Sequence, residues 1–153
     1  MDERTTTTSE GGGSPRRRQA GLLAWIRLAR VFQQVDRATA ELMRRWDLTT
    51  AQFDVLTQLG AHEGITQQEL ADRLLVTKGN VSQLLAKMER RGLVRRHQSG
   101  RSLALFLTAE GRRLQREALP AQEAMIAARF STLSADDGRA LLALLRRLDR
   151  TRP

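Results

Sequence analysis

The 153-residue chain contains no cysteine, no tyrosine and only two histidines. Without cysteine it can form no disulfide framework, no thiolate zinc site and no thiol redox sensor. His62 and His97 have no second ligand at helical spacing, so the sequence predicts no metal site, and it indicates no cofactor. No apolar run approaches 18 residues, which excludes a membrane span, and the first 18 residues lack the apolar core of a signal peptide. We therefore expect a cytoplasmic protein.

Positive charge, by contrast, is abundant and unevenly spread. The net charge is +9, and residues 66–101 alone carry +5. A basic excess concentrated in one segment favours nucleic acid as the partner over a generally solvated cationic surface. Residues 1–18 are rich in Thr, Gly and Ser, which is typical of a disordered tail, so we treat residues 19–153 as a single domain.

Within the basic segment, residues 66–91 predict two short helices joined by a tight turn. Thr66 and Glu69 form a capping-box pattern at the start of the first helix, and Thr77 is an N-cap for the second. The second helix has an apolar stripe at i, i+3, i+4 and i+7 and ends at Gly92. Its other face carries short polar and basic groups suited to a DNA major groove. The outward residues are Lys78, Gly79, Asn80, Ser82, Gln83, Lys87 and Arg91.

A cationic β-hairpin is predicted between residues 94 and 107. Leu103, Leu105 and Leu107 alternate as in a half-buried strand, and Gly100 suits a tight turn. Directly after a helix-turn-helix, such a hairpin is a wing that can contact phosphates or the neighbouring minor groove. The wing residues expected to contact DNA are Arg95, Arg96, His97 and, at the tip, Arg101.

Long helical patterns flank this central part. Residues 19–46 would span about 42 Å as a helix and carry apolar positions on more than one face. Residues 109–131 and 134–150 predict two further helices, with a kink at Pro120 in the first. These helices cannot bury their apolar stripes on a small lobe alone. We therefore predict that residues 19–46 and 109–150 form a dimerisation region and that residues 49–108 form the DNA-binding lobe.

Helix starts can also be predicted outside the basic segment. Thr49 with Gln52 forms a second capping-box pattern, and Thr108 is placed to cap the helix that follows the hairpin. Ser134 with Asp137 opens the last helix in the same way. The predicted fold class is therefore mainly α (α+β), a winged helix-turn-helix with a two-stranded wing and additional terminal helices.

Four segments make the chain resemble transcriptional regulators of the multiple-antibiotic-resistance regulator (MarR) family, over roughly residues 20–150. The segments are LTTAQFDVLTQL (48–59), TQQELADRL (66–74), VTKGNVSQLLAKMERRGLV (76–94) and LFLTAEGR (105–112). The resemblance implies a winged-helix homodimer that binds a palindromic operator and is released by small phenolic or other anionic ligands. The wing of such regulators usually carries an Asp two residues before the arginine that matches Arg101, whereas this chain has Ser99 there.

The amides of Gln83 and Asn80 are the best candidates to read bases, because an amide can pair bidentately with adenine. The resemblance also places Gly79 among base-contacting positions. Ser82 and Lys87 are expected to contact phosphates. The remaining predicted DNA-binding residues are Gln67, Thr77 and Lys78. A ligand cavity could be lined by aromatic side chains, although aromatics at this spacing are also typical of a plain core; the candidates are Trp25, Phe32, Trp46 and Phe53.

The sequence thus predicts a sequence-specific DNA-binding transcriptional regulator, and we expect a homodimeric repressor controlled by a small molecule. One alternative is a winged-helix DNA-binding protein without effector control, and a weaker one is a module that docks RNA or protein. An enzyme is disfavoured, because the chain lacks a histidine–carboxylate constellation and a glycine-rich phosphate loop.

Overall fold

The computed structural model describes residues 15–99 and 102–150. The chain forms two compact units, residues 1–36 and 37–153. Helix α1 (Pro15–Met43) begins in the first unit and ends in the second. In the described part of the chain, no helix is long and apolar enough to cross a membrane.

The first unit shows an earlier helix start than the sequence predicts. The helix begins at Pro15 instead of residue 19, because proline is well suited to the first helical turn, where its missing N–H is not needed. The rest of the predicted tail, residues 1–14, lies outside the described residues. Large apolar side chains of this unit are exposed, namely Leu22, Leu23, Trp25, Ile26, Leu28, Val31 and Phe32.

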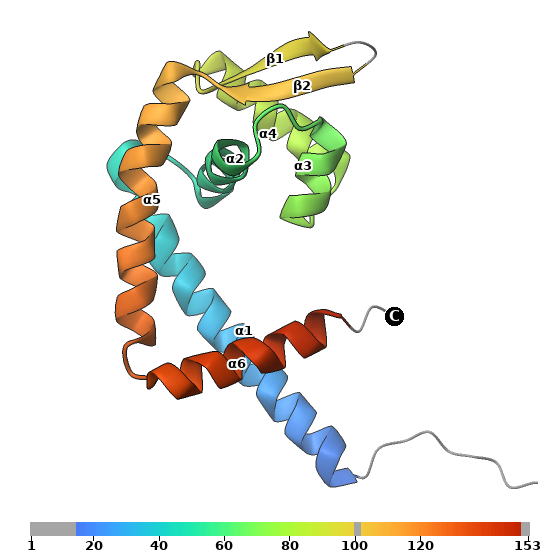
Figure 1. Cartoon of the computed structure of the whole chain (residues 1–153), viewed down its shortest axis with the longest axis vertical. Coiled ribbons are helices and arrows are strands. Elements are labelled where there is room, and N and C mark those ends of the chain that lie inside the picture. Colours follow the sequence, from blue (N-terminus) through green and yellow to red (C-terminus); the bar gives the residue numbers. More distant parts are fainter. Residues whose placement is uncertain (1–14, 100–101, 151–153) are drawn as a thin grey trace, which may run out of the picture. The chain divides into compact units, whose positions relative to one another are not determined.

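The second unit contains the predicted helix-turn-helix and wing (Figure 1). After the end of α1, its elements are η1 (Arg44–Trp46), α2 (Thr50–Ala61), α3 (Gln67–Leu74), α4 (Lys78–Arg90), β1 (Val94–Ser99), β2 (Ser102–Leu107), α5 (Ala109–Phe130) and α6 (Ala135–Asp149). The strands pair antiparallel, with Val94 opposite Leu107 and Ser99 opposite Ser102. The predicted fold class is confirmed. Helix α5 continues through Pro120, so the proline does not divide it.

Helices α2 to α6 each begin at the cap that the sequence predicts. The hydroxyls of Thr49, Thr66 and Ser134 each accept a hydrogen bond from the amide three residues on, within complete capping boxes. Thr77 accepts from the Asn80 amide, and Thr108 accepts from the amide of Gly111 in the same way. These bonds satisfy helix N–H groups that have no partner within the helix.

The capping box of α3 also affects an ionisable group. The Thr66 amide and hydroxyl donate to the Glu69 carboxylate at 2.7 and 2.8 Å. The two bonds favour the ionised form and lower the pKa of Glu69 below its ordinary value. The carboxylate therefore remains charged at the positive end of the α3 dipole, where a negative charge is stabilising.

One hydrophobic core holds the lobe together. Helix α2 packs against α5, α3 packs against α4, and β2 contacts α2 and α3. Phe53 lies in this core at 1% exposure, together with the fully buried Leu56, Leu85 and Leu105. The buried side of α4 is thus fixed on α2 and the wing, which leaves its polar side toward solvent.

The backbone of the loop between α2 and α3 pairs with strand β2 of the wing. The Gly64 amide donates to the Leu105 carbonyl at 2.8 Å, and the Leu105 amide donates to the Ile65 carbonyl at 2.9 Å. Gly64 adopts a φ of 83°, which glycine accepts without strain. The wing is therefore attached to the segment that leads directly into the helix-turn-helix.

Candidate nucleic-acid interface

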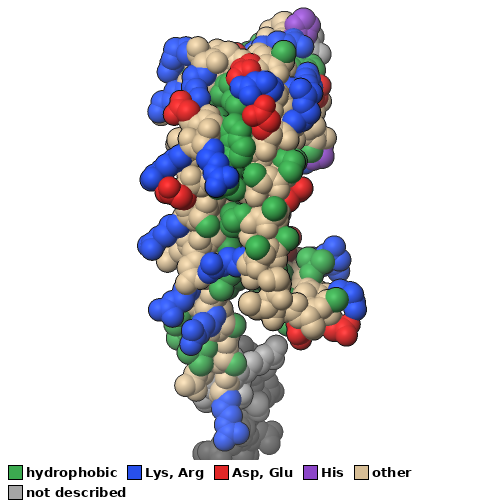
Figure 2. All heavy atoms as spheres, turned by 90° about the vertical axis from the view of Figure 1, so that its left-hand side faces the viewer, with side chains coloured by type: hydrophobic (Ala, Val, Ile, Leu, Met, Phe, Trp, Pro, Cys, Tyr) green, Lys and Arg blue, Asp and Glu red, His purple; other side chains and the backbone are tan. Residues whose placement is uncertain are grey.

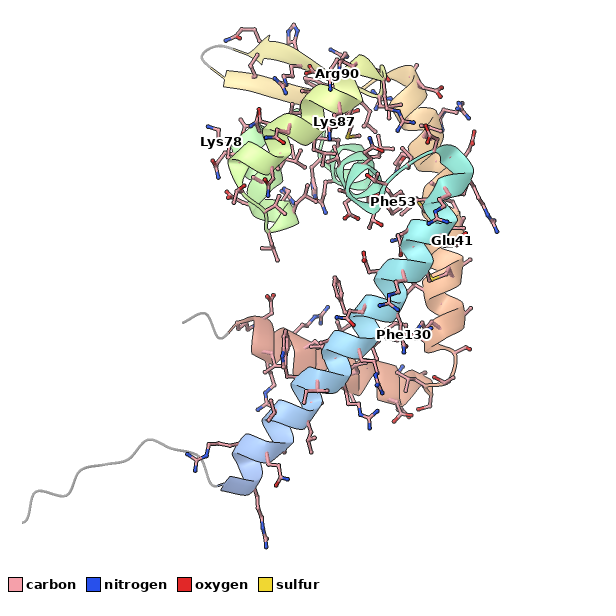
Figure 3. All side chains as sticks on the ribbon, turned by 180° about the vertical axis from the view of Figure 1, so that it is seen from behind. Glu41, Phe53, Lys78, Lys87, Arg90 and Phe130 are labelled. Atoms are coloured by element: carbon pink, nitrogen blue, oxygen red, sulfur yellow. The ribbon has the colours of Figure 1, made fainter. Side chains whose placement is uncertain are left out.

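Helix α4 presents the polar face that the sequence predicts. Lys78, Gly79, Asn80, Gln83 and Lys87 are exposed along it, and Ser82 is half-buried. Figure 3 shows Lys78 at the start of this helix, with Lys87 and Arg90 following along its length. Arg90 is an exposed cation that the sequence analysis did not select. Its position in the sequence could have identified it, because a residue three after Lys87 and seven after Gln83 lies on the same face of a helix.

The start of α4 is held by the preceding helix. The Gln67 side-chain amide donates to the backbone carbonyl of Lys78 at 3.1 Å. This bond uses one of the two N–H groups of the amide and leaves the other as a donor. The Thr77 oxygen accepts from Asn80, so its own hydrogen is also available to an acceptor such as a phosphate.

A hollow lies beside this face. Its volume is about 380 Å³, and it lies between α2 and α4. Asn80, Gln83 and Lys87 contribute polar groups to its wall, and Asp54 contributes a carboxylate from α2. The remaining lining residues are apolar: Ala51, Leu74, Val76, Val81 and Leu84. A small molecule bound there would contact the side chains that form the exposed face of α4.

The wing carries a cation on an aromatic support. Arg95 and Phe106 are cross-strand partners, and the guanidinium of Arg95 lies 4.8 Å from the centre of the Phe106 ring. His97 meets the same ring edge-on, with the two ring centres 6.5 Å apart. Stacking restricts the long Arg95 side chain and keeps its charge at the surface. The predicted turn residues Gly100 and Arg101 lie outside the described residues.

Two arginines make contacts that the sequence analysis does not predict. Arg91, expected on the outward face of α4, instead donates to the Asp47 carbonyl at 2.7 Å and to the Asp47 carboxylate and the Gln52 side chain at 3.1 Å. It belongs to the contact between the end of α4 and the loop before α2. Arg96 is half-buried, and its Nε lies 3.3 Å from the Glu89 carboxylate on α4. The sequence analysis does not predict this pairing with Glu89.

The four aromatic candidates for a ligand cavity have different surroundings. Phe53 lies in the core, and the Trp46 indole donates to the Glu117 carboxylate at 3.1 Å. Trp25 and Phe32 belong to the first unit and are 64% and 68% exposed. The aromatics are thus divided between the two units, and a cavity that they share stays a prediction.

Helix α5 carries an ion-pair network next to Trp46. Arg113 contacts the carboxylates of Glu110 at 2.6 Å and Glu117 at 2.7 Å. Figure 2 shows basic and acidic side chains next to one another in the upper part of the face that it draws. The hydrogen bonds from Arg113 lower the pKa of Glu110, so these charges are matched within the helix. On α4, by contrast, Lys78, Lys87 and Arg90 are exposed cations.

Comparison with known proteins agrees with this geometry. The sequence model of the MarR family matches residues 46–102. An uncharacterized HTH-type transcriptional regulator of Bacillus anthracis is 36% identical over 122 residues, which cover 80% of this chain and 83% of that protein. The chain belongs to the MarR family. It is therefore a DNA-binding transcriptional regulator and not an enzyme.

Solved structures of MarR-family regulators show the same fold. The Staphylococcus aureus MepR–DNA complex matches with a TM-score of 0.74 and 25% identity, covering 79% of this chain and 90% of MepR. The regulator PcaV of Streptomyces coelicolor, solved with its natural ligand, matches with a TM-score of 0.67 and 28% identity. That match covers 81% of this chain and 90% of PcaV.

Proposed function

We propose that this MarR-family regulator is a cytoplasmic homodimeric repressor that binds a pseudo-palindromic operator and is released by a small phenolic or other anionic molecule. The observation that carries the proposal is the exposed polar face of α4 beside the basic wing. Two such lobes related by a two-fold axis would meet half-sites roughly 34–36 Å apart. The exposed apolar side chains of α1 supply the surface for pairing two chains.

Each element of the lobe has a separate role in this proposal. Gln83 and Asn80 read base edges, and Gly79 lets the backbone approach the groove closely. Arg95 and His97 contact the backbone from the wing, and Arg101 enters the minor groove. Phosphates are contacted from the two helices by Gln67, Thr77, Lys78, Ser82, Lys87 and Arg90.

Release by a small molecule is supported by the hollow beside α4 and by the ligand seen in PcaV. A bound aromatic acid could place its carboxylate near Lys87 and its ring against the apolar wall. Such a ligand would compete with DNA for Asn80 and Gln83. Benzoate and salicylate added to a preformed complex are suitable first probes. Failure of any such anion to weaken binding would favour the alternative without effector control.

The experiment that tests the function is selection of bound duplexes from a random pool, followed by Gln83→Ala on the selected site. Loss of a bidentate amide–adenine pair should cost roughly 1–3 kcal/mol and flatten the preference at one base pair in each half-site. Gln34→Ala removes an exposed glutamine on another side of α1 and should leave both quantities unchanged.

Equal weakening of all duplexes by Gln83→Ala would show that Gln83 does not read bases. A wild-type protein that enriches no sequence would contradict the operator proposal. Efficient competition by duplex RNA would favour the RNA-binding alternative instead.

Gly79→Ala is expected to separate stability from DNA binding. A Cβ at Gly79 would meet no protein atom within 4 Å, and alanine favours a helix by up to about 1 kcal/mol over glycine. The variant should therefore unfold at higher denaturant concentration. Its methyl group would project at the position of closest approach to DNA, and such overpacking should cost roughly 1–3 kcal/mol of binding.

Gly138→Ala is the matched control, because Gly138 is a helical glycine of α6 that also has open space around it. It should raise stability and leave DNA binding unchanged. Unchanged binding by Gly79→Ala would remove Gly79 from the interface.

A further inference from the structure

The adjacent wing residues Arg95 and Arg96 have different surroundings. We propose that Arg96 is a positioning residue that holds the wing on α4 through Glu89, and that only Arg95 contacts DNA phosphate. This inference rests on the proposed use of α4 and the wing in DNA binding, and it assigns the two neighbouring cations separate roles.

The strand geometry separates the two side chains. Successive residues of a strand point to opposite faces. Arg95 is exposed and stacks on Phe106, whereas Arg96 pairs in register with the fully buried Leu105. Arg96 therefore faces α4, and its side chain is only 26% exposed.

The surroundings of the Arg96 guanidinium bind it to the protein. Its Nε lies 3.3 Å from the Glu89 carboxylate, and the Glu89 side chain is itself only 32% exposed. The Nε and Nη2 atoms are closed off from solvent and make no hydrogen bond to the described residues, so the contact with Glu89 is ionic. A cation in such a place needs a nearby counter-charge, and Glu89 supplies it.

The ion pair between Arg96 and Glu89 connects the wing to α4. Glu89 lies between Lys87 and Arg90 on the helix that carries the proposed base-reading residues. The pair therefore joins the wing strand to this helix and fixes the angle between them before DNA arrives. Drawing Arg96 out to a phosphate would leave the Glu89 carboxylate uncompensated beside a polyanion. Arg96 thus acts by preorganising the two contact surfaces, which reduces the ordering cost of binding.

The salt dependence of binding distinguishes the two roles. Each phosphate contact releases about one counterion. Arg95→Met should therefore make the negative slope of log K against log salt shallower by about two units per dimer. Arg96→Met should weaken binding by about tenfold, as for other coupled ion pairs, and leave the slope unchanged. Methionine keeps the apolar stem of each side chain.

Charge exchange tests the proposed partner. Glu89→Gln should weaken binding as Arg96→Met does, because Arg96 then lacks its counter-charge. The double variant Glu89→Arg with Arg96→Glu keeps the net charge and should recover most of the affinity. Glu89→Gln is nearly isosteric and breaks the same ion pair, so it still tests the proposal if Arg96→Met does not fold. Circular dichroism shows whether each variant is folded.

A slope lowered equally by Arg96→Met and Arg95→Met would make Arg96 a phosphate contact and overturn the assignment. An exchanged pair that recovers nothing would also overturn it. The slope can be measured on any duplex, so this outcome is separate from failure of the proposed function, in which the wild type enriches no sequence.

Discussion

Gly111→Ala is expected to destabilise the DNA-binding lobe by about 3 kcal/mol or more. A Cβ at Gly111 would lie 2.0 Å from the Leu93 carbonyl oxygen. This oxygen accepts the Thr108 amide at 3.1 Å, so it cannot move away without loss of the bond that precedes α5. Overpacking alone costs roughly 1–3 kcal/mol, and disruption of a buried hydrogen bond adds about 1 kcal/mol.

Urea unfolding followed by circular dichroism measures this loss. Gly138→Ala is the control, because it makes the same chemical change in a helix but has no atom within 4 Å of the new Cβ. That variant should be stabilised by about 0.5–1 kcal/mol. A loss below 1 kcal/mol for Gly111→Ala would mean that α5 and the Leu93 backbone move apart easily.

Local rules predict the starts of α2 to α6 correctly. The capping residues Thr49, Thr66, Thr77, Thr108 and Ser134 all cap as the sequence indicates. Each cap depends on groups only three residues apart, so the chain itself contains all the required information. The alternation in β2 is also local, although Leu103 at its beginning remains exposed.

Such local rules do not predict contacts between segments that are far apart in the sequence. Nothing in the helical pattern of α5 indicates that Gly111 meets Leu93, and nothing in α4 indicates that Arg91 binds Asp47. Arg91 and Asp47 are 44 residues apart, so only the packed lobe brings them together. The pairing of Gly64 with Leu105 was missed for the same reason.

The candidate site was predictable in its face but not in each residue. Helical spacing places Gln83 and Lys87 outward, and the structure agrees. The same spacing cannot distinguish Arg90 from Arg91, because both lie within a turn of Lys87. The packing of the lobe distinguishes them. Arg91 is the C-cap residue of α4, and its side chain binds the loop before α2.

The largest effect on DNA binding is expected from Trp25→Glu with Phe32→Glu. These two side chains, seven residues apart on α1, lie on one stripe with Leu22 and Ile26 and are exposed. Helix α6 also leaves Leu142, Leu144 and Leu148 exposed. Exposed apolar side chains that form a contiguous stripe mark an interaction surface. We expect the wild type to sediment at twice its 17.2 kDa chain mass and the variant as a monomer.

Separation of the chains should lower affinity for the selected operator by about 100-fold or more, because one lobe then binds without the effective concentration supplied by the other. Ala20→Glu with Arg27→Gln is the control, since it changes the charge of the same helix by the same amount at exposed positions on the side away from this stripe. It should remain dimeric and bind normally. Circular dichroism should show the lobe intact in both variants, because its core contains neither Trp25 nor Phe32. A wild type that is monomeric at micromolar concentration, or a glutamate variant that stays dimeric, would contradict pairing through this stripe and the half-site spacing that depends on it.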